Sequence, residues 1–266
     1  MNSPTSPRRL LLTANSTVAF VAAFTLTTLL HELGHFASYL AFGARATLYF
    51  NQVQADDATV SRAGVIVSAL AGPVVSLLQG IVAAWWVRAR GQNRHLDLFV
   101  QWLALLGFIN FFGYLMLTPL SAAGDTGKVA SLLGLPGWFD ILIALTGIAT
   151  LLVIVFRQDR CFAGFVLGEP GTRERAQWVN ALVFVPIIVG SAVNVAFAFP
   201  APAAISVIYP AMSSLTVMIG FSAVHNAQRP DLPTTPAATD LSWPWVAVAV
   251  ALLVINRLLV RGVSIP

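Results

Sequence analysis

The sequence predicts an all-α polytopic membrane protein with about six to seven transmembrane helices and a short polar interfacial hairpin after the first helix. Of its 266 residues, 57% are hydrophobic and only 10% are charged. Soluble domains carry about 25% charged residues. The mean hydropathy is +0.78, and apolar runs as long as one membrane crossing recur along nearly the whole chain. We therefore expect an integral, multi-pass membrane protein with the lipid bilayer as a partner.

The first apolar run covers about residues 11–42, which is longer than the roughly 20 residues that one span requires. A cleaved signal peptide is the alternative, because Arg8 and Arg9 precede the run. The run continues past the usual length of a signal's apolar region, which favours an uncleaved span. Aromatic and polar residues alternate in the next segment, residues 45–62, and this pattern predicts the interfacial hairpin.

Six further apolar runs follow, each close to the length of one crossing. They cover residues 63–87, 96–117, 138–156, 178–199, 203–221 and 243–260. Pro200 and Pro202 predict a tight turn between two of these runs. Residues 228–239 contain three prolines, so we expect an extended loop there. The single cysteine, Cys161, excludes an internal disulfide framework.

The basic residues lie at the ends of the apolar runs. With the N-terminus inside, ten Lys and Arg residues fall on inner segments and five on outer ones, which favours this orientation. The net charge of +4 is thus explained by membrane topology, and we expect no nucleic-acid partner. The sequence leaves the oligomeric state open.

The sequence His31-Glu32-Leu33-Gly34-His35 lies inside the first apolar run. Two histidines four residues apart share one face of a helix, so both imidazoles can bind a single zinc ion. Glu32 can lie beside a metal-bound water, where a general base is needed. Each charged residue at the centre of a span costs about 2.5 to 3.5 kcal/mol, which favours a functional role. Histidines in a helix cap or loop near the membrane surface are the alternative.

A catalytic zinc ion usually has three protein ligands and keeps one position for water. His95 and Asp97 are separated from His35 by one further span, which predicts that they lie across the membrane from it. Asp125 is the strongest remaining candidate, because Gly124 and Gly127 allow a close backbone approach there. Its alternative role is the N-cap of a helix, and the two roles can coexist. Three other aspartates fall on the same side as His35: Asp56, Asp57 and Asp140.

Three motifs carry a resemblance to a known family. They are His31-Glu-Leu-Gly-His35-Phe-Ala, then Ala71-Gly72-Pro73 in the next span, then the segment from Asn110 to Asp125. Residues 27–135 resemble the site-2 protease family of intramembrane zinc metalloproteases, as a divergent member. In this chain Ser76 stands where the family often has Asn, and Asn110 lies farther from Asp125 than in the family.

The resemblance implies one zinc ion bound by His31, His35 and Asp125, with Glu32 as the catalytic base. Residues 1–136 would form a metalloprotease-like membrane core carrying the zinc site, and residues 137–266 would add transmembrane helices of unknown role. The expected activity is hydrolysis of a peptide bond in or near a transmembrane segment of a membrane-protein substrate.

Three assignments and two other function classes stay open. Asn110, an amide among apolar neighbours, is a candidate for binding an unwound substrate strand or for an interhelical hydrogen bond. Gly72-Pro73 would allow close packing near the site or would break or kink the helix. The segment 45–62 would admit water or pair with a substrate strand, and a solvated loop at the interface is the alternative. The alternative functions are a proteolytically inactive scaffold that binds membrane helices, and a metal or solute transporter.

Overall fold

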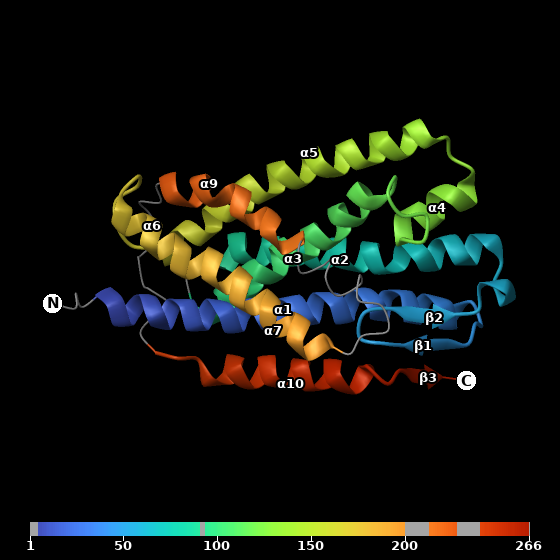
Figure 1. The fold of residues 1–266 in the computed structure, drawn as a ribbon, viewed down its shortest axis with the longest axis horizontal. Coiled ribbons are helices and arrows are strands. Elements are labelled where there is room, and N and C mark those ends of the chain that lie inside the picture. Colours follow the sequence, from blue (N-terminus) through green and yellow to red (C-terminus); the bar gives the residue numbers. More distant parts are fainter. Residues whose placement is uncertain (1–4, 91–93, 200–212, 228–239, 266) are drawn as a thin grey trace.

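The computed structural model describes residues 5–90, 94–199, 213–227 and 240–265 (Figure 1). The fold is mainly α-helical, as the sequence predicts. Within the described residues, five helical stretches are long and apolar enough to cross a membrane. They are α1 (Thr5–Ala41), α2 (Arg62–Arg90), α3 (His95–Leu117), α5 (Gly137–Phe162) and the run Arg173–Ala198. These lengths and compositions indicate a membrane protein.

The fifth stretch changes its helical type along its length. It begins as α6 (Arg173–Val179), passes through a π-helical turn at Asn180–Phe184, and continues as α7 (Val185–Ala198). Thr172 starts this stretch, because its side chain accepts a hydrogen bond from the backbone N–H of Arg175 at 3.3 Å.

The remaining helices are shorter. They are the 3₁₀ turns η1 (Asp57–Thr59), η2 (Ala163–Phe165) and η4 (Ser214–Gly220), and the helices α4 (Asp125–Leu133), α9 (Phe221–Asn226) and α10 (Trp243–Leu259). In the predicted span 203–221, the described part forms η4 and the start of α9, and residues 203–212 lie outside the described residues. The predicted Pro200–Pro202 turn and the loop 228–239 also lie outside them. At 17 residues, α10 is shorter than the roughly 20 residues of a full crossing.

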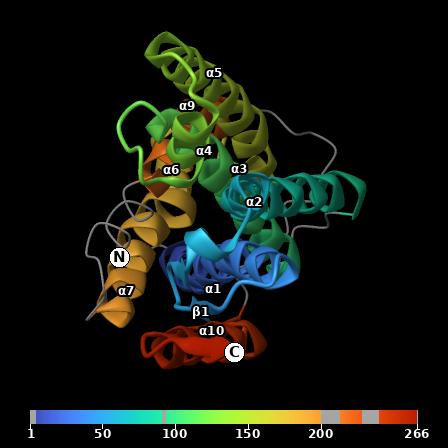
Figure 2. The same cartoon turned by 90° about the vertical axis from the view of Figure 1, so that its right-hand side faces the viewer.

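Helix α1 lies between α10 and the helices α2 and α3 (Figure 2). It packs on α2 and α3 on one side and on α7 and α10 on the other, while α5 packs on α3. The core between α1, α3 and α5 contains the fully buried Trp102. Its ring meets Phe20 edge-on with centroids 5.1 Å apart, and its Nε1 donates a hydrogen bond to Ser16 at 3.0 Å. The buried indole is therefore both packed and satisfied in its hydrogen bonding.

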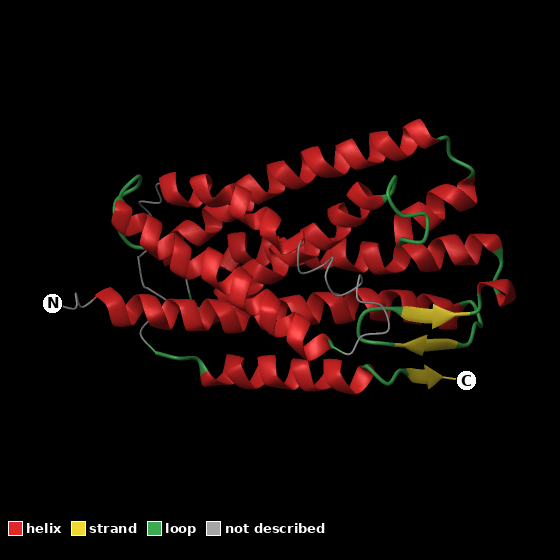
Figure 3. Ribbon diagram, viewed as in Figure 1, coloured by secondary structure: helices red, strands yellow, loops and turns green. Residues whose placement is uncertain are grey.

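A small sheet lies beside the end of α1 (Figure 3). Strands β1 (Ala46–Leu48) and β2 (Val53–Ala55) pair antiparallel within the segment predicted to form a hairpin. The position of this hairpin relative to a membrane surface stays a prediction. Strand β3 (Val263–Ile265) pairs antiparallel with the other edge of β1, which gives the strand order β2-β1-β3. No pattern in the sequence predicts β3.

Candidate metal centre

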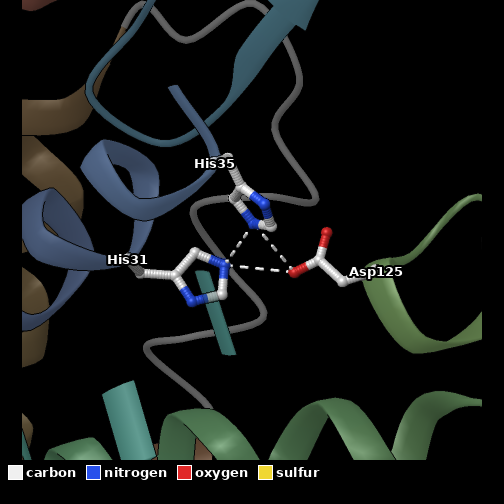
Figure 4. A group of neighbouring side chains, drawn as sticks. All are labelled: His31, His35 and Asp125. Atoms are coloured by element: carbon white, nitrogen blue, oxygen red, sulfur yellow. Dashed lines mark hydrogen bonds and ion pairs between the residues drawn. The ribbon is translucent and has the colours of Figure 1, made fainter. Parts of the chain in front are cut away.

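His31, His35 and Asp125 converge on one point (Figure 4). Helix α1 presents both histidines on the same face, as their spacing predicts, and both are buried. Their Nε2 atoms lie 3.0 Å apart. Asp125 Oδ2 lies 3.1 Å from His31 Nε2 and 3.2 Å from His35 Nε2. Among the described residues, these three form a group that could hold a metal ion.

Hydrogen bonds on the far side of each ring orient the two imidazoles. His35 Nδ1 lies 2.7 Å from the backbone oxygen of Ser68, so Nδ1 must carry a hydrogen and donate it. His31 Nδ1 lies 3.2 Å from Ser76 Oγ, whose own hydroxyl can donate to the backbone oxygen of Gly72 at 3.2 Å. In the neutral rings, both Nε2 atoms then have free lone pairs that face each other. Metal-binding histidines commonly have such partners on the second nitrogen.

The donor set fits zinc. Two nitrogen lone pairs that face each other beside a carboxylate repel unless a cation or a proton lies between them. Tetrahedral zinc with bonds of about 2.0–2.1 Å separates its ligand atoms by about 3.3 Å. The three separations here are 3.0, 3.1 and 3.2 Å. Two imidazoles and one carboxylate also form a ligand set that zinc enzymes use.

Asp125 reaches the histidines from the first turn of α4. Gly124, and not Asp125, is the N-cap of this helix, so the alternative assignment of Asp125 as the N-cap is wrong. A Cβ on Gly127 would lie 1.9 Å from the backbone oxygen of Ser121, so this glycine is required for the tight approach. Gly124 has no such contact. Burial acts to raise the pKa of Asp125, but when the Nε2 atoms of the two histidines carry protons, their hydrogen bonds and charge outweigh burial and hold the pKa well below the usual range. Asp125 is then ionised beside protonated rings, and a bound cation would take the place of those protons.

The other aspartates named in the sequence analysis lie elsewhere. Asp56 caps η1 by accepting from the backbone N–H of Ala58 at 3.0 Å. Asp57 accepts from the Tyr39 hydroxyl at 2.8 Å. Asp140 lies in the first turn of α5, and Asp97 accepts from a backbone N–H at the start of α3. His95 also begins α3, at the end of that helix remote from α4 (Figure 1).

Glycines let α2 lie directly against the histidine-bearing face of α1. A Cβ on Gly72 would lie 2.3 Å from His35 Nε2, and one on Gly34 would lie 2.9 Å from the backbone oxygen of Ala71. Helix α2 runs without interruption through Pro73, so the expectation of a helix break at Gly72-Pro73 is wrong. The expectation of close packing there is confirmed.

A cavity of about 670 Å³ adjoins the centre. Glu32 is buried and lines this cavity together with His31 and Asn110. The buried Oδ1 of Asn110 has no hydrogen-bond partner among the described residues, so the alternative of an interhelical hydrogen bond finds no support in this atom. Asn51 and Gln52, from the turn between β1 and β2, also line the cavity.

Several contributors to the centre have little or no signal in the sequence. Tyr114 stacks on the ring of His31, with centroids 4.9 Å apart and planes inclined by 10°. Thr126 Oγ1 donates to the backbone oxygen of Tyr114 at 2.7 Å, which ties the start of α4 to α3. The contact between His35 and the backbone oxygen of Ser68 could be made by any residue at position 68, so the sequence does not indicate it. A hydroxyl inside an apolar run, as at Ser76, weakly indicates a hydrogen bond to a neighbouring helix.

A charged cluster fixes α4 one turn beyond Asp125. Lys128 forms an ion pair with Asp57 and lies 3.3 Å from the Tyr39 hydroxyl. Partial burial acts to lower the pKa of Lys128, but its hydrogen bond to Asp57 outweighs this and raises the pKa. On α1, Tyr39 follows His35 by four residues. The cluster therefore joins the same two helix faces that carry the candidate ligands.

Comparisons with known proteins find no relatives. No protein-family model matches the chain, and neither a curated protein nor a solved structure matches it. The geometry and chemistry of the centre are therefore the basis for assigning a function.

Proposed function

We propose that this protein is an intramembrane zinc metalloprotease, a divergent relative of the site-2 proteases, that hydrolyses a peptide bond in or near a transmembrane segment. The observation that carries the proposal is the convergence of His31, His35 and Asp125 beside a cavity that Glu32 also lines. The buried positions of His31, Glu32 and His35 on a long apolar helix add support, because ionisable groups in such helices are usually functional.

We assign the roles of the residues from the resemblance and from the position of each side chain at the centre. His31, His35 and Asp125 would hold one zinc ion, which when bound supplies a Lewis acid that acidifies water and polarises the scissile carbonyl. Glu32 accepts the proton of the attacking water and later donates it to the leaving amine. The hydrogen bonds from His31 to Ser76 and from His35 to Ser68 keep both rings in their ligand tautomer.

The substrate would be a membrane protein whose helix unwinds locally, because the carbonyls of an intact helix are already hydrogen-bonded. Asn110 would bind the unwound backbone, since its amide oxygen is buried, unpaired among the described residues, and beside the same cavity. Water is the second reactant. Asn51 and Gln52 supply polar surface to the cavity from the hairpin turn, which supports a route for water along this segment.

Metal content and cleavage test the proposal together. We expect about one zinc ion per chain in the purified wild type and in Glu32→Gln, and far less in His35→Ala, because Glu32 is not a ligand. Equal zinc in wild type and His35→Ala would refute the metal centre. Candidate membrane proteins co-expressed with Glu32→Gln should accumulate uncut, and a cleavage product that persisted unchanged would exclude the proposed chemistry.

The same variants separate the other two function classes. A proteolytically inactive scaffold would bind its partner helices equally well in the wild type and in Glu32→Gln, without any product. A transporter would move metal or solute into liposomes, and that flux would not depend on Glu32. Neither class requires a general base beside the three ligands.

A further inference from the structure

Gly113 is a glycine that packing among the described residues does not explain. It lies inside α3, where glycine destabilises a helix relative to alanine. No atom of a described residue lies within 4 Å of a Cβ built there, and its backbone does not adopt a positive φ. Gly107 on the same helix is different, because its Cβ would lie 2.7 Å from the backbone oxygen of Ser76 on α2.

The open space above Gly113 belongs to the cavity beside the metal centre. Tyr114, the next residue, stacks on His31. Asn110 lies one helical turn earlier on the same face of α3. A peptide backbone bound by Asn110 would therefore bring a neighbouring side chain over Gly113, next to the candidate ligands.

The lining of the cavity indicates the class of side chain. Most of its surface is apolar, and the apolar side chains come mainly from α3, with Leu106, Ile109 and Leu117, while α1 adds Phe24 beside its polar lining residues. Its volume of about 670 Å³ is within the range of about 300–1,000 Å³ found for sites that enclose small ligands. An apolar wall of this size favours a large apolar group, because burial of apolar surface drives such binding.

We propose that Gly113 is a specificity-determining residue, whose missing side chain leaves room for a large apolar side chain of the substrate beside the scissile bond. The inference rests on the proposed protease function and adds the substrate class. It predicts that selectivity depends on the size of the residue at position 113, while zinc binding does not.

Peptide hydroxamates are suitable probes, since the hydroxamate group binds zinc and the adjacent side chain can be varied. Three compounds carrying an alanine, leucine or phenylalanine side chain would be titrated against zinc-loaded protein in detergent. The variants are Gly113→Ala and Gly113→Leu. Gly137→Leu is the matched control, because Gly137 is also a helical glycine with open space around its Cβ, but it does not line the cavity.

We expect the wild type and Gly137→Leu to bind the phenylalanine compound about tenfold or more tightly than the alanine compound. In Gly113→Leu, the phenylalanine compound should lose about tenfold or more in affinity, with the alanine compound nearly unchanged. The affinity of Gly113→Ala for the phenylalanine compound should lie between those of the wild type and Gly113→Leu. All variants should keep their zinc, and retained zinc also reports an intact fold.

Two outcomes overturn the inference, and they are distinguishable. If the zinc-loaded wild type binds the three compounds equally, or if Gly113→Leu weakens all three to the same degree, the pocket assignment is wrong and the metal centre stands. If the wild type binds neither zinc nor any hydroxamate, the proposed function fails and the inference fails with it.

Discussion

Replacing Gly72 with alanine tests the metal centre without changing any ligand. The new Cβ would lie 2.3 Å from His35 Nε2 and 2.6 Å from Cδ2 of the same ring. Ordinary van der Waals contact begins at 3.4 Å, so the ring must move by about 1 Å or α2 must withdraw. Either movement shifts the nitrogen that would bind zinc and stretches the 2.7 Å hydrogen bond from His35 to Ser68.

The expected effect is a loss of zinc affinity. Disturbing the groups that orient a metal ligand typically weakens metal binding by about 10- to 100-fold, which corresponds to about 1.4 to 2.7 kcal/mol. Helix propensity acts in the opposite direction, because alanine stabilises a helix by about 0.5–1 kcal/mol relative to glycine. A net loss of affinity therefore reports the contact with His35.

Zinc affinity would be measured by competition with a chromophoric chelator in detergent, alongside helicity by circular dichroism. Gly80→Ala is the matched control on the same helix, because its Cβ would lie 2.9 Å from the ring of Phe108 and far from any candidate ligand. If Gly72→Ala binds zinc with the same affinity as the wild type, or loses no more zinc affinity than Gly80→Ala, the reasoning is refuted.

Three further variants probe other parts of the centre. Gly127→Ala would place a Cβ 1.9 Å from a backbone oxygen in the loop before α4, and should lower zinc affinity about tenfold or more by moving that helix. Lys128→Ala removes the contacts with Asp57 and Tyr39 and should weaken zinc binding a few-fold, since the pair is partly exposed. Asn110→Leu should reduce cleavage of a membrane substrate and leave zinc content unchanged.

Each of these variants has its own control. Gly134→Ala is the control for Gly127→Ala. No atom of a described residue lies within 4 Å of its Cβ, but its φ is 66°, so the substitution strains the end of α4 without moving the loop before that helix. Lys128→Arg should restore zinc affinity because it can keep the ion pair, and failure to do so would contradict the positioning role. Asn110→Gln keeps an amide in the cavity. If it and Asn110→Leu both cleaved like the wild type, Asn110 would not bind substrate.

Much of the centre could be predicted because its signals are local in the sequence. The spacing of His31 and His35 dictates that both face one side of a helix. The number of intervening spans predicts that Asp125 lies on the same side as the two histidines, and its Oδ2 lies within 3.2 Å of both rings. The role of Gly127 also followed from the sequence, since a glycine beside a ligand indicates close backbone approach.

Other features depend on contacts between distant segments, which leave little trace in residue types. The stacking of Tyr114 on His31 needs the relative rotation of two helices, and Tyr114 by itself resembles any interior aromatic residue. Strand β3 spans three residues, too few for a periodic pattern to indicate a strand. The clash that makes Gly72 necessary depends on how closely α1 and α2 approach.

The pairing of β3 with β1 has a practical consequence for shortened forms of this protein. β1 directly follows the helix that carries both imidazoles, and one of its edges is covered only by residues 263–265 within the described chain. A fragment ending at residue 136 would leave those backbone groups open, and open strand edges recruit other polypeptides. Expression trials that seek a minimal form carrying the candidate metal centre should therefore co-express the segment 240–265, and an affinity tag joined after β3 would lie beside this sheet.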